Sequence, residues 1–404
     1  MIYIHIPFCR SFCTYCDFYS EVAAKCRRAE DVARQESLFA DYSVALGNEI
    51  SARKDEMNGS FNTLYIGGGT PSVLPLHVYE RLMSDLASVG IKMPFDEFTF
   101  EVNPEDIVEK GEAYVEGLMR LGVSRFSMGV QSFDDGILKW MNRRHDARIS
   151  FKAYHILESA GAGNISIDLI FGLPQLSDSK WSDTLKKALE ISSKGLMPKH
   201  ISSYQLSVEP GSALAKLSDR GIWSEASDEK CASQYSMLCA TLAEAGYNHY
   251  EISNFAQPGF EARHNSAYWV HVPYVGLGPG AHSLSFPRSI TDPISDRQST
   301  GRVKTVSRRQ WNRADLQAYI ADPISVQEYE DLNEDQLIME KIMLALRTSD
   351  GIPESFLRAH ADPDALSRAL EDGALSLSRI PGNIRIPESR FFVSDAIVAD
   401  LCGG

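Results

Sequence analysis

Long apolar runs, an excess of basic residues and a disulfide pattern are all missing from this 404-residue sequence. No stretch approaches the ~20 uninterrupted apolar residues of a transmembrane helix. The net charge of −14 argues against a nucleic-acid surface spread over the whole protein, because phosphate binding needs a basic patch. The N-terminus lacks the basic, apolar and small-residue pattern of a cleaved signal peptide. We therefore expect an ordinary soluble globular protein without a membrane span.

Cysteines are few, and their number is odd. There are seven, and three of them, Cys9, Cys13 and Cys16, lie close together in the sequence. Such usage is typical of a metal site in a reducing compartment and not of a secreted disulfide framework. The sequence therefore predicts a cytoplasmic protein.

The three neighbouring cysteines follow a predicted strand, residues 2–6, which Pro7 ends. A loop lets three thiolates converge on one centre, which a strand does not allow because its side chains alternate between faces. The spacing C-x3-C-x2-C suits three of the four ligands of a zinc ion, with Cys26 or His5 as the fourth. It equally suits an iron–sulfur cubane with one iron left open.

Predicted strands and helices alternate over the first half of the chain, which indicates a parallel sheet with helices outside. The predicted strands are 2–6, 61–66, 98–104, 125–133, 165–174 and 199–206. The predicted helices are 22–51, 74–89, 111–121 and 135–141, with later ones at 227–246 and 334–347.

Polar or glycine-rich positions fall at the carboxyl ends of these predicted strands, where ligands bind in such folds. They are the Gly67–Thr70 turn, Glu101, Gln131 and Asp168. A carboxylate inside an apolar strand, as at Glu101, needs a partner. That partner is either the amine of a ligand or an arginine of the barrel.

The remainder of the chain predicts a different organisation. We expect a main domain over 1–290, a polar linker over 291–325 and a small helical domain over 326–404 with a β-ribbon near Gly382. The ribbon resembles the wing of a winged helix. Because this tail has no basic cluster, we expect no nucleic-acid partner.

Several motifs together resemble the oxygen-independent coproporphyrinogen III oxidase-like family of radical S-adenosylmethionine (SAM) proteins. They are Tyr3–Cys9, Gly67–Pro71, Glu101–Pro104, Ser127–Phe133 and Asp168–Pro174. The resemblance implies an α/β fold, a partial (β/α)6 barrel followed by the small winged-helix-like domain.

The same resemblance implies two cofactors. Cys9, Cys13 and Cys16 would hold a [4Fe–4S] cluster, with Tyr15 as the aromatic residue of the cluster motif. The positions that match SAM contacts in the family are Tyr3, Gly68, Gly69, Thr70, Glu101, Gln131, Arg143 and Asp168.

Two departures separate this chain from the true oxidases and indicate the HemW-type branch of heme chaperones. The oxidases have a long segment before the cluster motif and a further cysteine two residues after its third cysteine. Here the first ligand is already Cys9, and Phe18 occupies the other position. We therefore expect coproporphyrinogen oxidase activity to be absent, and keep that activity as the alternative function.

The motif His264–Trp269 matches the His-Asn-x-x-Tyr-Trp signature that this branch associates with heme. His264 would bind iron, and the rings of Tyr268 and Trp269 would face a porphyrin. Alternatively, the motif is a packing lock with His264 hydrogen-bonded in the interior. The histidines that remain in this region are His249, His271 and His282.

Resemblance to this branch also implies a ligand, a class of recipient proteins and a place where they meet. Heme is the bound ligand, and heme-accepting respiratory proteins are the recipients. We expect the acceptor to be met at the cytoplasmic face of a membrane, by peripheral contact only.

Overall fold

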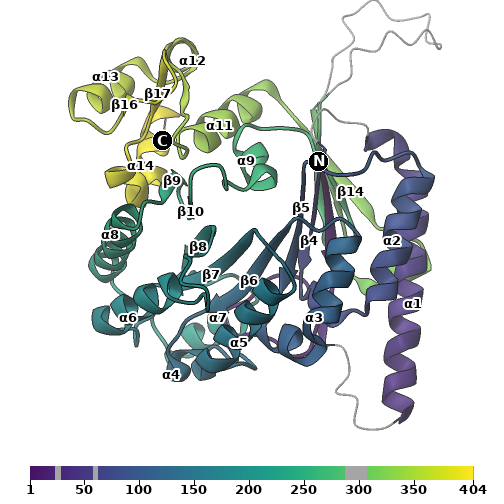
Figure 1. The fold of residues 1–404 in the computed structure, drawn as a ribbon. Helices are drawn as coiled ribbons and strands as arrows, with labels where there is room; N and C mark the ends of the chain where they lie inside the picture. Colours follow the sequence, from purple (N-terminus) through teal and green to yellow (C-terminus); the bar gives the residue numbers. More distant parts are fainter. Residues whose placement is uncertain (23–28, 58–61, 287–306, 404) are drawn as a thin grey trace, which may run out of the picture.

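The structure is a computed structural model that describes residues 1–22, 29–57, 62–286 and 307–403 (Figure 1). Its main sheet has nine strands in the order β11-β1-β4-β5-β6-β7-β8-β10-β9. Six of them, in chain order, form the parallel core predicted from the sequence. They are β1 (Ile2–Ile6), β4 (Thr63–Gly68), β5 (Glu97–Val102), β6 (Arg125–Gln131), β7 (Ile165–Phe171) and β8 (His200–Gln205).

The helices that follow these strands cover the outer face of the sheet (Figure 1). They are α1 (Ala29–Ala52), α2 (Leu76–Ser88), α3 (Pro104–Arg120), α5 (Ala147–Ser159), α6 (Asp178–Leu189) and α8 (Asp228–Glu244). The short helices α4 (Asp135–Trp140) and α7 (Ala213–Asp219) lie beside the loop of the three cysteines, where Thr14 forms backbone hydrogen bonds with Met141 and Leu214. Short 3-10 turns lie at η1 (Lys54–Glu56) and η2 (Pro71–Val73). The sequence predicted only the second half of α3, which breaks at Gly111, a residue with φ 71°. Its first half begins at Pro104, where proline's fixed φ suits the first helical position.

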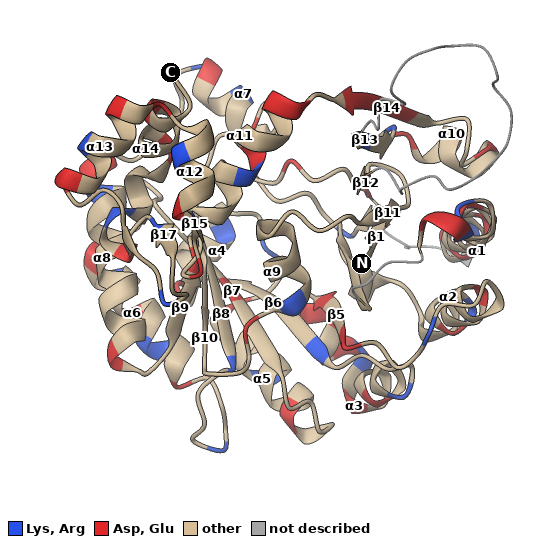
Figure 2. Ribbon diagram, turned by 90° about the horizontal axis from the view of Figure 1, so that it is seen from above, with Lys and Arg blue, Asp and Glu red and all other residues tan. Residues whose placement is uncertain are grey.

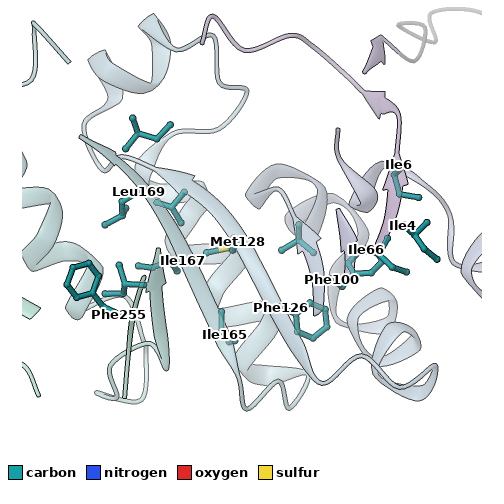
Figure 3. Close-up of a cluster of buried hydrophobic side chains, with 14 of the residues drawn as sticks. Ile4, Ile6, Ile66, Phe100, Phe126, Met128, Ile165, Ile167, Leu169 and Phe255 are labelled. Atoms are coloured by element: carbon teal, nitrogen blue, oxygen red, sulfur yellow. The ribbon is translucent and has the colours of Figure 1, made fainter. Parts of the chain in front are cut away.

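Side chains alternate between the two faces of each parallel strand. Ile66, Phe100, Met128 and Ile167 are buried in the apolar core under the helices (Figure 3). Their neighbours along the strands, among them Tyr65, Glu101, Ser127 and Asp168, face the interior of the barrel and line a cavity. Strand geometry requires this two-residue period. One face of the sheet therefore builds the core while the other carries polar groups.

The two edges of the barrel are closed by segments far apart in the sequence. Strand β11 (Val275–Leu277) pairs in parallel with β1, so that Tyr3 lies opposite Gly276. At the other edge, β10 (Asn254–Ala256) and β9 (Asn248–Glu251) add antiparallel strands to β8. Helix α9 (Arg263–Trp269) connects these two edges. The loop that carries the three cysteines, which we call the cluster loop, adds a short pair of parallel strands, β2 (Phe8–Cys9) and β3 (Glu21–Val22).

The predicted linker, 291–325, lies partly outside the described residues. From residue 307 onward, the described part of this segment forms β13 (Ser307–Asn312) and α10 (Leu316–Ala321). Strand β13 pairs with β12 (His282–Ser285) on one side and β14 (Gln327–Leu332) on the other. The polar composition concealed this strand because its charged side chains pair across the sheet, as Arg308 does with Asp331. Acidic residues are conspicuous along β14 (Figure 2).

The C-terminal part is helical and carries a three-stranded antiparallel sheet. Its helices are α11 (Glu334–Ala345), α12 (Glu354–His360), α13 (Pro363–Glu371) and α14 (Ser394–Leu401), with a 3-10 turn η3 (Glu388–Val393). The sheet has the order β15 (Ile352–Pro353), β17 (Asn383–Arg385) and β16 (Ser376–Leu377), which is the ribbon predicted from the sequence. This part packs on the barrel edge, where Phe391 contacts the ring of His249.

The predicted fold class is confirmed: an α/β partial barrel with a small helical and winged C-terminal part. The boundaries at 290 and 326 remain predictions. Among the described residues, none of the helices combines the length and apolar composition that crossing a bilayer requires.

Candidate functional site

A cavity of about 570 Å³ lies at the carboxyl ends of the parallel strands, and we call it the cluster cavity. Most of the site residues predicted from the sequence line it. They are Cys9, Cys13, Tyr15, Cys16, Gly68, Gly69, Thr70, Glu101, Gln131, Arg143 and Asp168. Four residues predicted with them, Tyr3, His264, Tyr268 and Trp269, do not.

The three cysteines of the loop are held by neighbours from other strands. Cys9 Sγ lies 3.3 Å from Thr70 Oγ1, and Arg143 Nη1 donates to Cys13 Sγ at 3.5 Å. Burial raises the pKa of Cys9, and it raises that of Cys16 to about 12. These thiols therefore keep their protons at neutral pH until a metal displaces them.

The donor set fits an iron–sulfur cluster better than a single zinc ion. No three His, Cys, Asp or Glu side chains in the described ranges are grouped as one ion would need. In a cubane each cysteine binds a different iron, so the sulfurs stand further apart. His5, a candidate fourth ligand for zinc, has both ring nitrogens engaged, by Tyr3 and by the Tyr19 carbonyl. The other candidate, Cys26, lies outside the described residues.

The glycine-rich turn after β4 allows neighbouring groups to approach the backbone closely. A Cβ atom at Gly67 would lie 2.8 Å from the Glu101 carboxylate, and one at Gly68 would lie 2.7 Å from the His5 ring. Gly68 also has φ 108°, a conformation that glycine adopts without steric cost. Glycine at these two positions therefore leaves room for the side chains of Glu101 and His5.

Glu101 is held by a hydroxyl and a backbone amide. Tyr65 Oη donates to it at 2.5 Å and the Gly68 N–H at 3.2 Å. Burial raises the pKa of Glu101 to about 7, although the Tyr65 hydrogen bond opposes this shift. Of the two partners predicted for this carboxylate, the barrel arginine forms no ion pair with it in the part of the chain that is described. The carboxylate is therefore available to the amine of a ligand.

Arg143 connects the cluster loop with the ends of β5 and β6. Its Nη2 donates to Asn103 Oδ1 and to the Gly129 carbonyl, both at 2.8 Å. Its Nε is buried without a partner in the described structure. At the end of β6 the register shifts, and Gln131 takes φ 66°. This irregularity turns Gln131 toward the cavity.

The Asp168 carboxylate accepts a hydrogen bond from Ser127 Oγ at 3.1 Å, and burial raises the pKa of Asp168. Polar residues that the sequence did not single out share this wall, namely Tyr65, Asn103, Arg125, Ser127, Ser202 and Tyr204. Most of these residues lie two positions along the chain from another cavity residue, and this spacing could have placed them on the same face. Asn265, from the motif assigned to heme, also lines this cavity.

A second cavity of about 370 Å³ lies beside the first, and we call it the aromatic cavity. It is lined by Tyr3, His5, Asp17, Phe18, Tyr19, Tyr268, Tyr274, Gly280 and His282. The predicted SAM residue Tyr3 lies here, although its ring also contacts that of Tyr65, with centroids 5.9 Å apart.

The His264–Trp269 motif forms α9, and its histidine is locked in the interior. His264 is 1% exposed. Its Nδ1 lies 2.9 Å from Thr63 Oγ1 and its Nε2 lies 3.1 Å from Tyr268 Oη. Burial lowers the pKa of His264 to about 3. Trp269 is half-buried and lines neither cavity. This is the packing arrangement that the sequence offered as the alternative to iron ligation.

Comparisons with known proteins show what this chain is similar to. Residues 3–188 match the family model of the radical SAM superfamily. A heme chaperone HemW from Synechocystis sp. is 33% identical over 353 residues, which is 87% of this chain and 78% of that protein. A heme chaperone HemW from Lactococcus lactis is 36% identical over 279 residues, 69% of this chain and 68% of that protein.

Among solved structures, coproporphyrinogen III oxidase (HemN) from Escherichia coli superimposes with a TM-score of 0.75. The match covers 100% of this chain and 89% of that one, at 22% identity. At this identity the likeness shows the fold alone. The relatives named HemW share more of the sequence and align over more than two thirds of their own length. The chain belongs to the HemW family of radical SAM proteins.

Proposed function

We propose that this protein is a heme chaperone that binds a [4Fe–4S] cluster, SAM and heme, and delivers heme to acceptor proteins. One observation carries the proposal: relatives that are 33% and 36% identical over two thirds or more of both chains are named heme chaperones. The acceptors would be respiratory proteins, met in the cytoplasm by peripheral contact with a membrane.

In this proposal the cluster cavity holds the iron–sulfur cluster and SAM. Cys9, Cys13 and Cys16 would bind three irons, and the bound cluster would supply an open iron for the amino and carboxylate groups of SAM. Glu101 offers a buried carboxylate to a cationic group. Asp168 and Gln131, on the neighbouring strand ends, offer acceptors for hydroxyl groups.

The alternative function is oxygen-independent coproporphyrinogen III oxidation, which removes carboxyl groups from propionate side chains. Because the fold of an oxidase superimposes on the whole chain, the experiment below also tests this function. Phe18 stands where the oxidases have a further cysteine, which argues against it.

The experiment uses anaerobically reconstituted protein loaded with heme and mixed with heme-depleted respiratory membranes. We expect heme-dependent oxidase activity to return faster than with the same amount of free heme. Apomyoglobin, which takes up heme from many donors, serves as a control for passive release. Absence of stable heme binding by the wild type would contradict the proposal. Formation of protoporphyrinogen from coproporphyrinogen with SAM and a strong reductant would establish the alternative.

A further inference from the structure

We infer that the heme iron is bound by His282 in the aromatic cavity, and not by His264 of the motif. This inference rests on the proposed function and names the site at which the heme would bind. Three observations carry it: the state of every histidine in the chain, the composition of the cavity wall, and the position of His282 at its rim.

An axial ligand needs an imidazole nitrogen with a free lone pair, and four histidines of this chain have neither ring nitrogen free. Both ring nitrogens have a partner within 3.1 Å in the four histidines His5, His145, His200 and His264. His155 and His271 have one ring nitrogen engaged at 3.0 Å, by a carbonyl and by Glu340, and neither lines the cluster cavity or the aromatic cavity. His249 is buried between Phe255 and Phe391.

Three histidines remain without a ring hydrogen bond in the described structure: His77, His282 and His360. His77 is exposed on α2, and the ring of His360 contacts that of Phe356 at a tilt of 45°, with centroids 4.5 Å apart. Neither lines the cluster cavity or the aromatic cavity. His282 lines the aromatic cavity and is exposed to solvent. Of the ten histidines, it alone combines free ring nitrogens with a place in one of these cavities.

The wall of the aromatic cavity suits a flat macrocycle. Four tyrosines, Tyr3, Tyr19, Tyr268 and Tyr274, line it together with Phe18. Two of these rings support each other, since Tyr268 and Tyr274 meet edge to face with centroids 4.7 Å apart. Aromatic faces bury a large apolar area and retain a polar group at the ring edge. A porphyrin presents the same combination, with an apolar ring and peripheral carboxylates.

His282 is held at the rim by a rigid turn. It begins β12 after the glycine-rich segment 278–281, and a Cβ at Gly276 would lie 2.0 Å from the His282 carbonyl oxygen. Its ring stacks on Trp311 of β13, with centroids 6.1 Å apart and 25° between the planes. Burial, together with the charge of Arg309, lowers the pKa of His282. The imidazole is therefore in the neutral form that binds iron.

The lining of the aromatic cavity offers one imidazole with free ring nitrogens, that of His282. The other imidazole in this wall, His5, is engaged on both nitrogens. Asp17 is the carboxylate of the lining, and its charge would repel the heme carboxylates. A single imidazole ligand would suit a protein that must release its heme.

The test is a titration of ferric heme into cluster-loaded protein, followed by the Soret band. The variants are His282→Ala, His264→Ala and His77→Ala. His77 is the matched control, because it too is exposed and lacks a ring hydrogen bond but lines neither cavity. We expect His282→Ala to lose the imidazole-ligated spectrum and to bind heme at least about tenfold more weakly, since even outer partners of metal ligands contribute that much. His77→Ala should match the wild type.

Two further measurements separate ligation from packing. Added imidazole should restore the ligated spectrum of His282→Ala. Metal-free protoporphyrin, which has no iron to ligate, should bind the wild type and His282→Ala equally. A wild-type spectrum and affinity in His282→Ala would overturn the inference while leaving the chaperone function intact. Loss of heme by His264→Ala alone, with an unchanged melting curve, would also overturn it. A wild type that binds no heme would instead remove the proposed function.

Discussion

The cluster cavity and the aromatic cavity lie side by side but are built by different means. The cluster cavity gathers thiols, carboxylates and arginines from the cysteine loop and consecutive strand ends, all between residues 9 and 209, and adds Asn265. The aromatic cavity brings together residues 3–19 and 268–282, from segments far apart in the chain, by pairing β1 with β11. The thiols and charged groups of the cluster cavity come mostly from the motifs found in the sequence. The tyrosines of the aromatic cavity are brought together by closure of the barrel edge.

Asp17 and Phe18 belong to both cavities. They follow Cys16 directly, so the loop that carries the cysteines is also the wall between the two sites. One short segment therefore borders both cavities. The predictions below test whether the two cavities can be disturbed separately.

The largest expected effect is loss of the iron–sulfur cluster in Cys13→Ala. A cubane held by three cysteines should not survive removal of one of them. Iron and sulfide analysis after anaerobic reconstitution should give about four of each in the wild type and almost none in the variant. Heme binding should persist, because Cys13 does not line the aromatic cavity.

Cys402→Ala is the matched control, since this half-buried thiol lies in the C-terminal tail and outside both cavities. Stoichiometric zinc in place of iron in anaerobically prepared wild type would contradict the cluster assignment.

The second prediction concerns Gly67→Ala. The new Cβ would overlap Tyr65 and Glu101, at 2.7 and 2.8 Å, and displace their hydrogen bond. Overpacking typically costs about 1–3 kcal/mol. If this free energy is lost from SAM binding, the affinity for SAM should drop by about 5- to 150-fold. Calorimetric titration of SAM measures it. Gly163→Ala is the control, because nothing lies within 4 Å of its Cβ; equal affinities in the two variants would show that the turn is not part of the site.

The third prediction is a pH dependence that Glu101 causes. Its pKa is raised from 4.5 to about 7, mainly by burial, so the folded protein holds a proton that the unfolded chain has released. Between these pH values the contribution of Glu101 to the unfolding free energy falls as pH rises. Binding of a cationic amine should change in the opposite direction and strengthen as pH rises through about 7. Glu101→Gln should remove both dependences.

Glu251 provides a matched control for this titration. Burial raises its pKa to about 7 as well, but it lies outside the cluster cavity. Glu251→Gln should therefore alter the pH dependence of stability and leave that of SAM binding unchanged. A SAM affinity in wild type that is constant from pH 6 to pH 8 would refute the role of Glu101.

The smallest effect is expected for Tyr268→Phe. This change keeps the ring in the aromatic cavity and removes the hydroxyl that meets His264 Nε2 at 3.1 Å. One such hydrogen bond contributes about 1 kcal/mol to stability. Denaturant titration should detect this loss, while heme affinity should change little. Tyr329→Phe, on an exposed ring of β14, is the control. Loss of heme without loss of stability would instead assign the Tyr268 hydroxyl to the ligand.

The parallel sheet and the cluster cavity could be predicted largely from the sequence. Strand residues alternate with a fixed period, and the carboxyl ends of parallel strands meet at one rim, so Glu101, Gln131 and Asp168 were expected to converge there. The strand β13 was missed because its polar side chains pair with those of β14 and carry no apolar alternation. Tyr65 was missed because it reads as one more apolar residue of β4.

The sequence alone determined which residue types the chain carries at its strand ends, because local periodicity sets which way each side chain faces. It did not determine which histidine is free. That depends on hydrogen bonds between segments as distant as Thr63 and His264, which form only when β4 and α9 pack together. The aromatic cavity likewise exists only because β11 closes on β1 and brings Tyr274 and His282 beside Tyr3. Such long-range pairing leaves no local pattern, so only the tertiary structure decided it.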